Sequence, residues 1–182
     1  MGLDFDGVVV YNPLRLARAP ITYFKRYVLG VKKLGFFVPK DQWQQEIWKF
    51  IHGSSSLPAN GLSKFKELTK EGIIEPHLIT ARFSFLDNHL YSWLEKHGLV
   101  PYFKTINMNL KNDQPHLFKE KMIKKYDLDY FIEDNLNVVE YLEPRVKAKV
   151  LWINNIIDRL LVNDRKGFPY LGKAIERILE KK

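Results

Sequence analysis

Cysteine is absent from the 182 residues of this chain. That absence excludes a disulfide framework, a thiolate zinc site and a thiol nucleophile. No run approaches the roughly 20 apolar residues of a membrane span, and no apolar stretch with a small-residue cleavage site opens the sequence. Together these absences lead us to expect a cytoplasmic enzyme.

Acidic residues are fewer than basic ones, 21 against 29, which gives a net charge of +8. Residues 11–60 carry eight Lys or Arg against two acids, and residues 144–182 carry ten against four. The intervening residues 61–143 are net negative by two. Such a balance suits a small phosphorylated molecule, nucleic acid or an anionic membrane surface, and does not choose among them.

An acidic pair, Asp4 and Asp6, ends a short apolar segment near the beginning of the sequence. Residues two apart on a strand point to one face, so both carboxylates would aim at one volume and could hold a hard cation. Gly7 permits the tight turn that must follow. A solvated acidic turn is the alternative reading. A calcium-binding loop is disfavoured, because its twelfth position requires Glu and holds Arg15 here.

Short apolar runs alternate with segments of helical periodicity, which indicates a parallel sheet with helical crossovers. Strands are expected over residues 73–80, 103–109, 129–135 and 149–154, and helices over 62–72, 85–97 (with Ser84 as N-cap), 115–126 and 171–182. In the insertion from 11 to about 60, helices are expected over 21–33 and 41–53, with Asp41 as N-cap and a hinge-like connection at 54–58. The apolar side chains of 41–53 are expected to pack.

Four motifs in order resemble those of the haloacid-dehalogenase-like superfamily of aspartate-nucleophile phosphatases. They are DFDGV (residues 4–8), HLITAR (77–82), Lys119 within FKEKMIKKYDLDYF (118–131), and FIEDN (131–135). The ITAR and FIEDN forms look most like the branch of deoxyribonucleotidases and related nucleotidases. Each motif also has a plain structural reading: Thr80 as a cap, Lys119 as a solvated lysine, and Glu133 with Asp134 as turn residues.

The resemblance implies an α/β fold, a three-layer Rossmann-like parallel sheet with helices on both faces and a small helical cap inserted after the first strand. Residues 1–10 and 61–182 would form the core, and residues 11–60 the cap. Ligands of open α/β sheets bind at the carboxyl ends of the strands, where Asp4, Thr80 and Asp134 are expected to meet.

The resemblance also implies catalytic roles. Asp4 would attack phosphorus, and Asp6 would protonate the leaving oxygen and later activate water. Thr80 would hydrogen-bond the phosphoryl group, and Lys119 would offset the negative charge. Because Asp6 is a carboxylate, the pattern is typical of phosphatases and phosphomutases, whereas the dehalogenase branch lacks this group.

The implied cofactor is Mg²⁺, held by Asp4, the carbonyl of Asp6 and Asp134, with Glu133 as a further candidate ligand. Substrate binding is assigned to Ala81 and Arg82, which follow Thr80, and to two residues of the insertion.

Those two residues are Arg15 and Arg18, which lie one helical turn apart before Pro20. They could form a solvated face, or they could grip a second anionic group of the substrate, for which the planar guanidinium is suited.

The sequence therefore predicts a magnesium-dependent phosphate-monoester hydrolase acting on a nucleotide or another small phosphorylated metabolite. Two alternatives stay open. One is a phosphomutase or phosphotransferase on the same scaffold. The other is a non-catalytic protein whose basic insertion binds nucleic acid or an anionic membrane. The oligomeric state is left open.

Overall fold

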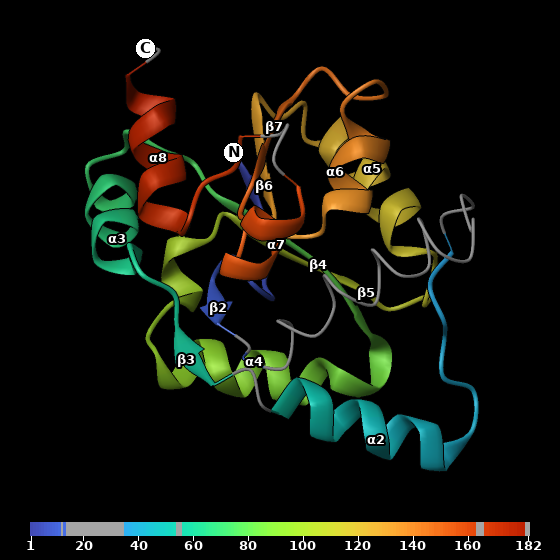
Figure 1. The fold of residues 1–182 in the computed structure, drawn as a ribbon. Coiled ribbons are helices and arrows are strands. Elements are labelled where there is room, and N and C mark those ends of the chain that lie inside the picture. Colours follow the sequence, from blue (N-terminus) through green and yellow to red (C-terminus); the bar gives the residue numbers. More distant parts are fainter. Residues whose placement is uncertain (12, 14–34, 54–55, 163–165, 181–182) are drawn as a thin grey trace.

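The two-residue strand β1 (Gly2–Leu3) lies at the centre of a five-stranded parallel sheet of order β5-β4-β1-β6-β7 (Figure 1). The structure is a computed structural model that describes residues 1–11, 13, 35–53, 56–162 and 166–180. β1 pairs with β4 on one side and with β6 on the other. The remaining strands of this sheet are β4 (His77–Phe83), β5 (Thr105–Asn109), β6 (Tyr130–Glu133) and β7 (Lys149–Trp152).

Successive side chains of the strands enter two separate apolar cores, one on each face of the sheet. In β4, Leu78 belongs to one core and Ile79 to the other, and Ile132 and Phe131 of β6 divide in the same way. This alternation follows from the period of two along a strand. Both faces of the sheet are thus buried, as parallel sheets require.

Helices cover both faces, so the predicted three-layer Rossmann-like fold is confirmed (Figure 1). Side chains of α3, α4 and α8 pack in one core, and those of α5 and α6 in the other. The bounds are α3 (Leu62–Lys70), α4 (Asp87–Lys96), α5 (Pro115–Lys125), α6 (Leu136–Leu142), α7 (Ile156–Leu161) and α8 (Leu171–Leu179), with 3₁₀ turns η3 (Ser84–Leu86) and η4 (Val100–Tyr102).

The prediction that Ser84 caps the helix after β4 is wrong. Ser84 begins the 3₁₀ turn η3, and α4 itself begins at Asp87 without a side-chain cap. Asn112 engages Ser84 instead: the Ser84 amide donates to Asn112 Oδ1 at 2.9 Å, and Asn112 Nδ2 donates to the hydroxyl at 3.2 Å. The side chain that was expected to cap a helix thus joins two loops.

A two-stranded antiparallel ribbon forms the base of the insertion. Strands β2 (Val10–Tyr11) and β3 (Leu57–Pro58) pair through Val10 with Pro58 and through Tyr11 with Leu57. The hinge-like connection expected over 54–58 is therefore partly a strand. Proline has no N–H to donate to a strand pairing. Pro58 is tolerated because every strand of a two-stranded ribbon is an edge strand, where such a donor is not required.

Helix α2 (Gln42–Gly53) is the described helix of the insertion, and it starts and ends where expected. Gln44 Nε2 donates to Asp41 Oδ2 at 2.8 Å, and the Lys40 amide donates to Gln44 Oε1 at 3.0 Å, which ties the helix start to the chain before it. The expectation that its apolar side chains pack is wrong for Trp43 and Phe50, which are 65% and 79% exposed. The second expected helix, over 21–33, lies outside the described residues.

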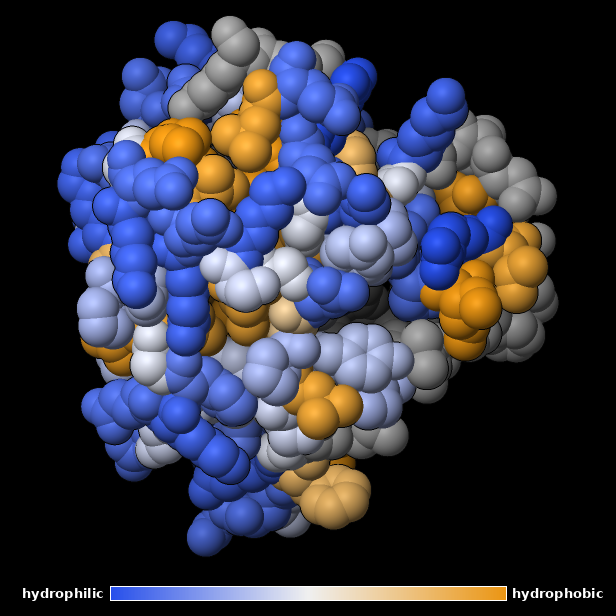
Figure 2. All heavy atoms as spheres, turned by 90° about the vertical axis from the view of Figure 1, so that its left-hand side faces the viewer, coloured by the Kyte–Doolittle hydropathy of each residue, from blue (hydrophilic) through white to orange (hydrophobic). Residues whose placement is uncertain are grey.

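The face of the molecule that carries α3 and α8 is mainly hydrophilic, with separate apolar patches (Figure 2). Within the described part of the chain, no helix has the length and apolar character needed to cross a membrane.

Candidate active site

Asp4 follows directly on β1 and is held by the backbone around it. Its amide donates to the carbonyl of Ile132 in β6 at 3.0 Å, and its Oδ1 accepts from the amide of Phe5 at 2.8 Å. Phe5 is fully buried and packs edge-to-face on Trp93, with ring centroids 5.2 Å apart. Asp4 is only 3% exposed. The solvated acidic turn considered from the sequence is therefore ruled out.

Lys119 bridges two of the acidic side chains. Pro115 begins α5, which suits a residue without an N–H, and one turn later Lys119 lies buried against the sheet. Its Nζ lies 2.9 Å from Asp4 Oδ2 and 2.6 Å from Glu133 Oε2. Burial lowers the pKa of Lys119, but the charges of Asp4 and Glu133 outweigh it and raise this pKa above its ordinary value. Lys119 is therefore a buried cation, and the reading as a solvated lysine is wrong.

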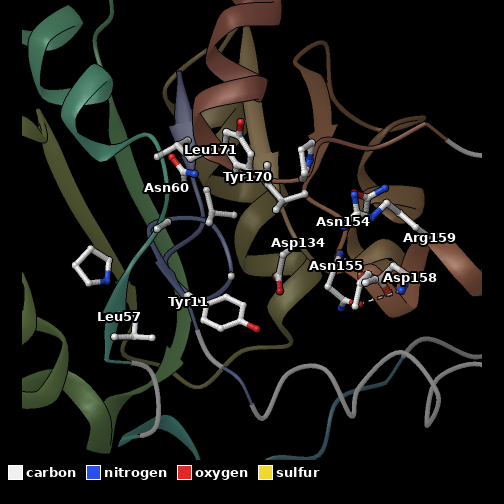
Figure 3. A pocket seen from close by; sticks show the side chains of 17 residues that line it. Tyr11, Leu57, Asn60, Asp134, Asn154, Asn155, Asp158, Arg159, Tyr170 and Leu171 are labelled. Carbon is white, nitrogen blue, oxygen red and sulfur yellow. Dashed lines mark hydrogen bonds between the residues drawn. The ribbon is translucent and has the colours of Figure 1, made fainter.

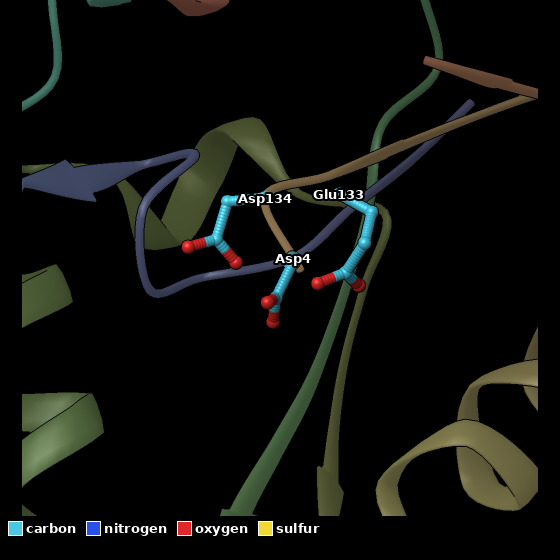
Figure 4. Close-up of side chains that lie close together, drawn as sticks. All are labelled: Asp4, Glu133 and Asp134. Atoms are coloured by element: carbon cyan, nitrogen blue, oxygen red, sulfur yellow. The ribbon is translucent and has the colours of Figure 1, made fainter. Parts of the chain in front are cut away.

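Asp4, Glu133 and Asp134 form an acidic cluster whose carboxylates converge (Figure 4). One oxygen from each lies within 4.8 Å of the others, and all three residues are buried. Glu133 Oε1 accepts from the amide of Asn135 at 2.9 Å, which fixes its carboxylate. Burial raises the pKa of Glu133 to about 8, against the lowering effect of Lys119 and with further raising by Asp4 and Asp134.

The formal charges of this cluster suit a divalent cation. Three carboxylates and the ammonium of Lys119 leave two negative charges in a buried volume. Uncompensated buried charge is costly, and the raised pKa of Glu133 is the response to it. The ligands are all hard oxygen atoms, which Mg²⁺ prefers. The cluster therefore fits the ion that the motifs imply.

Asp6 lies beside this cluster and is clamped by Arg82 of β4. Arg82 Nε donates to Asp6 Oδ2 and Nη2 donates to Oδ1, both at 2.8 Å. The guanidinium carbon lies 4.6 Å from the centroid of the Phe5 ring. Burial by itself raises the pKa of Asp6, but Arg82 and, less strongly, His52 hold it well below its usual value. Asp6 therefore stands as a carboxylate at neutral pH.

Two histidines that the sequence did not single out, His52 and His89, contact the pair of Asp6 and Arg82. His52, near the end of α2, has Nδ1 at 3.6 Å from Asp6 Oδ2. Arg82 Nη1 donates to His89 Nδ1 at 2.9 Å, and burial and Arg82 lower the pKa of His89, which keeps this ring a neutral acceptor. Neither position carries a local pattern that would have marked it. The contact of His52 links the insertion to the core at Asp6.

A cavity of about 210 Å³ contains the catalytic candidates of the core. Asp4, Asp6, Thr80, Ala81, Arg82, Lys119 and Glu133 all line it. Thr80 is buried at the point where the pairing of β4 with β5 shifts register. Arg82 lines the same cavity, but its guanidinium faces Asp6. Arg15 and Arg18, the other predicted substrate contacts, lie outside the described residues.

Gly7 is the tightest backbone position next to the acidic cluster. Its φ of +81° lies in the left-handed region, and a Cβ there would collide with the carboxylate of Asp134. We expect Gly7→Ala to displace Asp134 and to weaken Mg²⁺ binding at least about tenfold, since one charged ligand is lost. Titration of the purified variant with Mg²⁺, followed calorimetrically, measures this change.

Gly72 provides a matched control. Its φ is +70°, and a Cβ there would meet nothing within 4 Å. Gly72→Ala shares the left-handed strain, about 1–2 kcal/mol of unfolding free energy, without the collision. Equal Mg²⁺ affinities in the two variants would show that Gly7 does not position Asp134.

Solved structures of similar fold match most of this chain. A candidate beta-phosphoglucomutase from Thermotoga maritima matches with a TM-score of 0.59 and 17% identity over 98% of this chain and 97% of that chain. CbbY from Rhodobacter sphaeroides, in complex with phosphate, matches with a TM-score of 0.58 and 12% identity over 94% of each chain.

A haloacid-dehalogenase-like family hydrolase from Xanthomonas campestris has a TM-score of 0.54 and 14% identity, over 98% of this chain and 94% of that chain. No family model and no curated protein matches the sequence. At identities this low, the structural similarity establishes the fold alone. The chain has the haloacid-dehalogenase-like fold, as its four motifs predict.

Proposed function

We propose that this protein is a magnesium-dependent phosphate-monoester hydrolase that works through an aspartyl-phosphate on Asp4. The observation that carries the proposal is one buried lysine that lies between two members of a three-carboxylate cluster. A fourth carboxylate, Asp6, lines the same cavity as this lysine. A phosphate ester is anionic and resists an anionic nucleophile, so positive charge and in-line positioning must be supplied.

In the first step a carboxylate oxygen of Asp4 forms a bond to phosphorus while the bond from phosphorus to the ester oxygen breaks. Lys119 offsets the charge on Asp4 and on the phosphoryl group, because its Nζ already lies 2.9 Å from Asp4. Thr80 lines the same cavity and can donate its hydroxyl hydrogen to a phosphoryl oxygen. Asp4, the carbonyl of Asp6 and Asp134 would hold Mg²⁺, with Glu133 as a further candidate ligand, and the ion would supply further positive charge.

Asp6 serves both steps. The leaving oxygen must receive a proton. Asp6 does not carry that proton at neutral pH in this structure, because its carboxylate is paired with Arg82, which lowers its pKa. Asp6 can act as this acid only after Arg82 moves away, and it can act directly as the base that removes a proton from water in the second step. Attack of that water on phosphorus breaks the bond to Asp4, releases inorganic phosphate and restores the carboxylate.

The substrate proposed is a nucleotide or another small phosphorylated metabolite, on the resemblance of the ITAR and FIEDN motifs to nucleotidases. A phosphomutase is the second candidate, and the likeness to a candidate beta-phosphoglucomutase favours it. A non-catalytic binding protein is the third, through the excess of basic residues in 11–60.

A magnesium-dependent screen of phosphorylated metabolites tests the function. Release of inorganic phosphate from at least one nucleotide or sugar phosphate is expected. If the phosphoryl group is transferred within the substrate and no phosphate is released, the hydrolase proposal is wrong and the protein is a phosphomutase. Binding of RNA or anionic vesicles with no turnover of any ester would overturn both.

Arg15 and Arg18 are proposed to contact a second anionic group of the substrate. Under this proposal Arg15→Ala combined with Arg18→Ala raises KM at least about tenfold for a nucleotide, because charge-assisted hydrogen bonds are lost. A small generic ester such as p-nitrophenyl phosphate is expected to keep its KM, since the chemistry lies in the core. Steady-state kinetics on both substrates measure the difference, and an equal response would remove these arginines from substrate selection.

A further inference from the structure

The guanidinium of Arg82 is held by three neighbours. Two of its nitrogen atoms donate to Asp6, its carbon lies 4.6 Å from the centroid of the Phe5 ring, and Nη1 donates to His89 Nδ1 at 2.9 Å. The side chain is only 1% exposed. A long side chain has several rotatable bonds, so these contacts together restrict Arg82 to one rotamer. The contact with His89 is the one that the proposed mechanism does not yet use.

His89 contacts Arg82 without lining the catalytic cavity. Arg82 and Asp6 belong to the wall of that cavity, and His89 does not. A second cavity, of about 480 Å³, has Asp134 in its wall and includes neither Asp6, Arg82 nor His89 (Figure 3). His89 would therefore act on a molecule in either cavity through Arg82, and not by direct contact.

His89 is suited to hold an arginine. The guanidinium of Arg82 has only N–H donors, so Nδ1 of His89 must accept and the ring proton lies on Nε2. Burial and the charge of Arg82 lower the pKa of His89, which favours this neutral ring. His89 lies in the first turn of α4, whose Leu90 and Leu94 are fully buried in the core. A packed helix thus carries the acceptor, and helices place such groups more precisely than loops do.

We propose that His89 is a positioning residue: it holds Arg82, and Arg82 in turn fixes the carboxylate of Asp6 for the second step of the reaction. This inference rests on the proposed function. In that step a water oxygen bonds to phosphorus and the bond from phosphorus to Asp4 breaks. One proton of the water passes to Asp6, and the other stays on the phosphate that is released.

The clamp is compatible with this role of Asp6 as a base. A carboxylate has about four lone-pair sites, and the two hydrogen bonds from Arg82 take one on each oxygen. Orientation matters in such a step, because misplacing a reacting group by about 1 Å can cost roughly 10²-fold in rate. Loosening Arg82 should therefore slow the second step even though His89 never touches the water.

Two substitutions of similar shape test the role of His89. Asparagine Oδ1 is bonded to Cγ, as Nδ1 is in histidine, so His89→Asn keeps an acceptor near the same place. His89→Leu puts a methyl group there instead. Leucine favours helix formation more than asparagine does, so the leucine variant has no disadvantage within α4 itself. Thermal melts verify the folding of both variants.

Rapid-quench measurement of the phosphorylated protein separates the two steps. His89→Leu is expected to slow the decay of the aspartyl-phosphate about tenfold or more and to leave its formation within about twofold of the wild type, so that phosphorylated protein accumulates. Formation is spared because Arg82 must leave Asp6 in the first step in any case. His89→Asn is expected to recover most of the loss. Equal slowing of both steps, or unchanged decay in a folded His89→Leu protein, would overturn the proposal.

The Nε–H of Arg82 reports the same contact without any turnover. This hydrogen is bonded to Asp6, so we expect it to exchange slowly with water and to give a nuclear magnetic resonance signal in the wild type and in His89→Asn. The signal should disappear in His89→Leu, and its persistence there would show that His89 does not hold Arg82. If the signal behaves as expected but the wild type hydrolyses no phosphate ester, the proposed function is overturned and the hold of His89 on Arg82 stands.

Discussion

Replacing Asp4 with asparagine is expected to lower the rate of phosphate release at least about 10³-fold while leaving the protein folded. An amide cannot form the acyl-phosphate, and the loss of one charge from the acidic cluster weakens Mg²⁺ binding. The fold should persist because the asparagine oxygen can still accept from the Phe5 amide, and Lys119 keeps Glu133 as a partner at 2.6 Å. Single-turnover phosphate release and a thermal melt, both on purified protein, measure the two effects.

Asp129→Asn is the matched control. Asp129 is exposed and directly precedes β6, away from the cluster at the strand's carboxyl end, so this variant should keep wild-type turnover. Release by Asp4→Asn at a rate near the wild type would reject Asp4 as the nucleophile. Loss of activity in both variants would point to an unspecific effect of charge.

Chelation is expected to abolish phosphate release, and Mg²⁺ is expected to restore it. The acidic cluster of Asp4, Glu133 and Asp134 offers only oxygen ligands, and neither histidine nor thiolate is among them to favour zinc. Activity assayed in excess EDTA, then with Mg²⁺ or Zn²⁺ added back, measures the requirement. Full turnover in excess chelator would remove the cluster as a metal site.

The stabilising effect of Mg²⁺ should grow with pH. Without metal, the pKa of Glu133 is raised to about 8, so between roughly pH 4.5 and pH 8 the folded state holds a proton that the unfolded state has lost. The unfolding free energy of the metal-free protein therefore falls through this window as pH rises. Mg²⁺ competes with that proton, so its effect on the melting temperature should be larger at pH 8.5 than at pH 6.

The sheet was predictable because its strands are buried on both faces and read as short apolar runs between helical segments. Pro76 also marked correctly that β4 begins at His77. The short helices α6 and α7 were missed, although Asn155 and Asp158 form a capping box that the sequence displays. The exposure of Trp43 could not be read from the sequence, because helical periodicity identifies an apolar face and does not tell what lies against it.

In the candidate site, the meeting of Asp4 and Asp134 was predictable from motifs at strand ends, whereas Lys119, which lies on α5, was expected there from the family resemblance. The clamp of Arg82 on Asp6 was not, because it joins residues 76 positions apart through the rotamer of a long side chain. A substrate contact was therefore predicted for Arg82, where the structure shows an ion pair. His52 escaped detection for the same reason, since its contact depends on where α2 lies.

The central position of β1 has a consequence for synthesis of the chain. The Asp4 amide donates to the carbonyl of Ile132, so this bond cannot form until 128 further residues have been made. At the usual rates of translation that delay is on the order of ten seconds. Until β4 has been made, both edges of the nascent β1 are unpaired, and the edge that faces β6 stays unpaired to the end of the delay. An unpaired strand edge is a template for aggregation. The residue that we propose as nucleophile is thus made 128 residues before the partner that holds its amide.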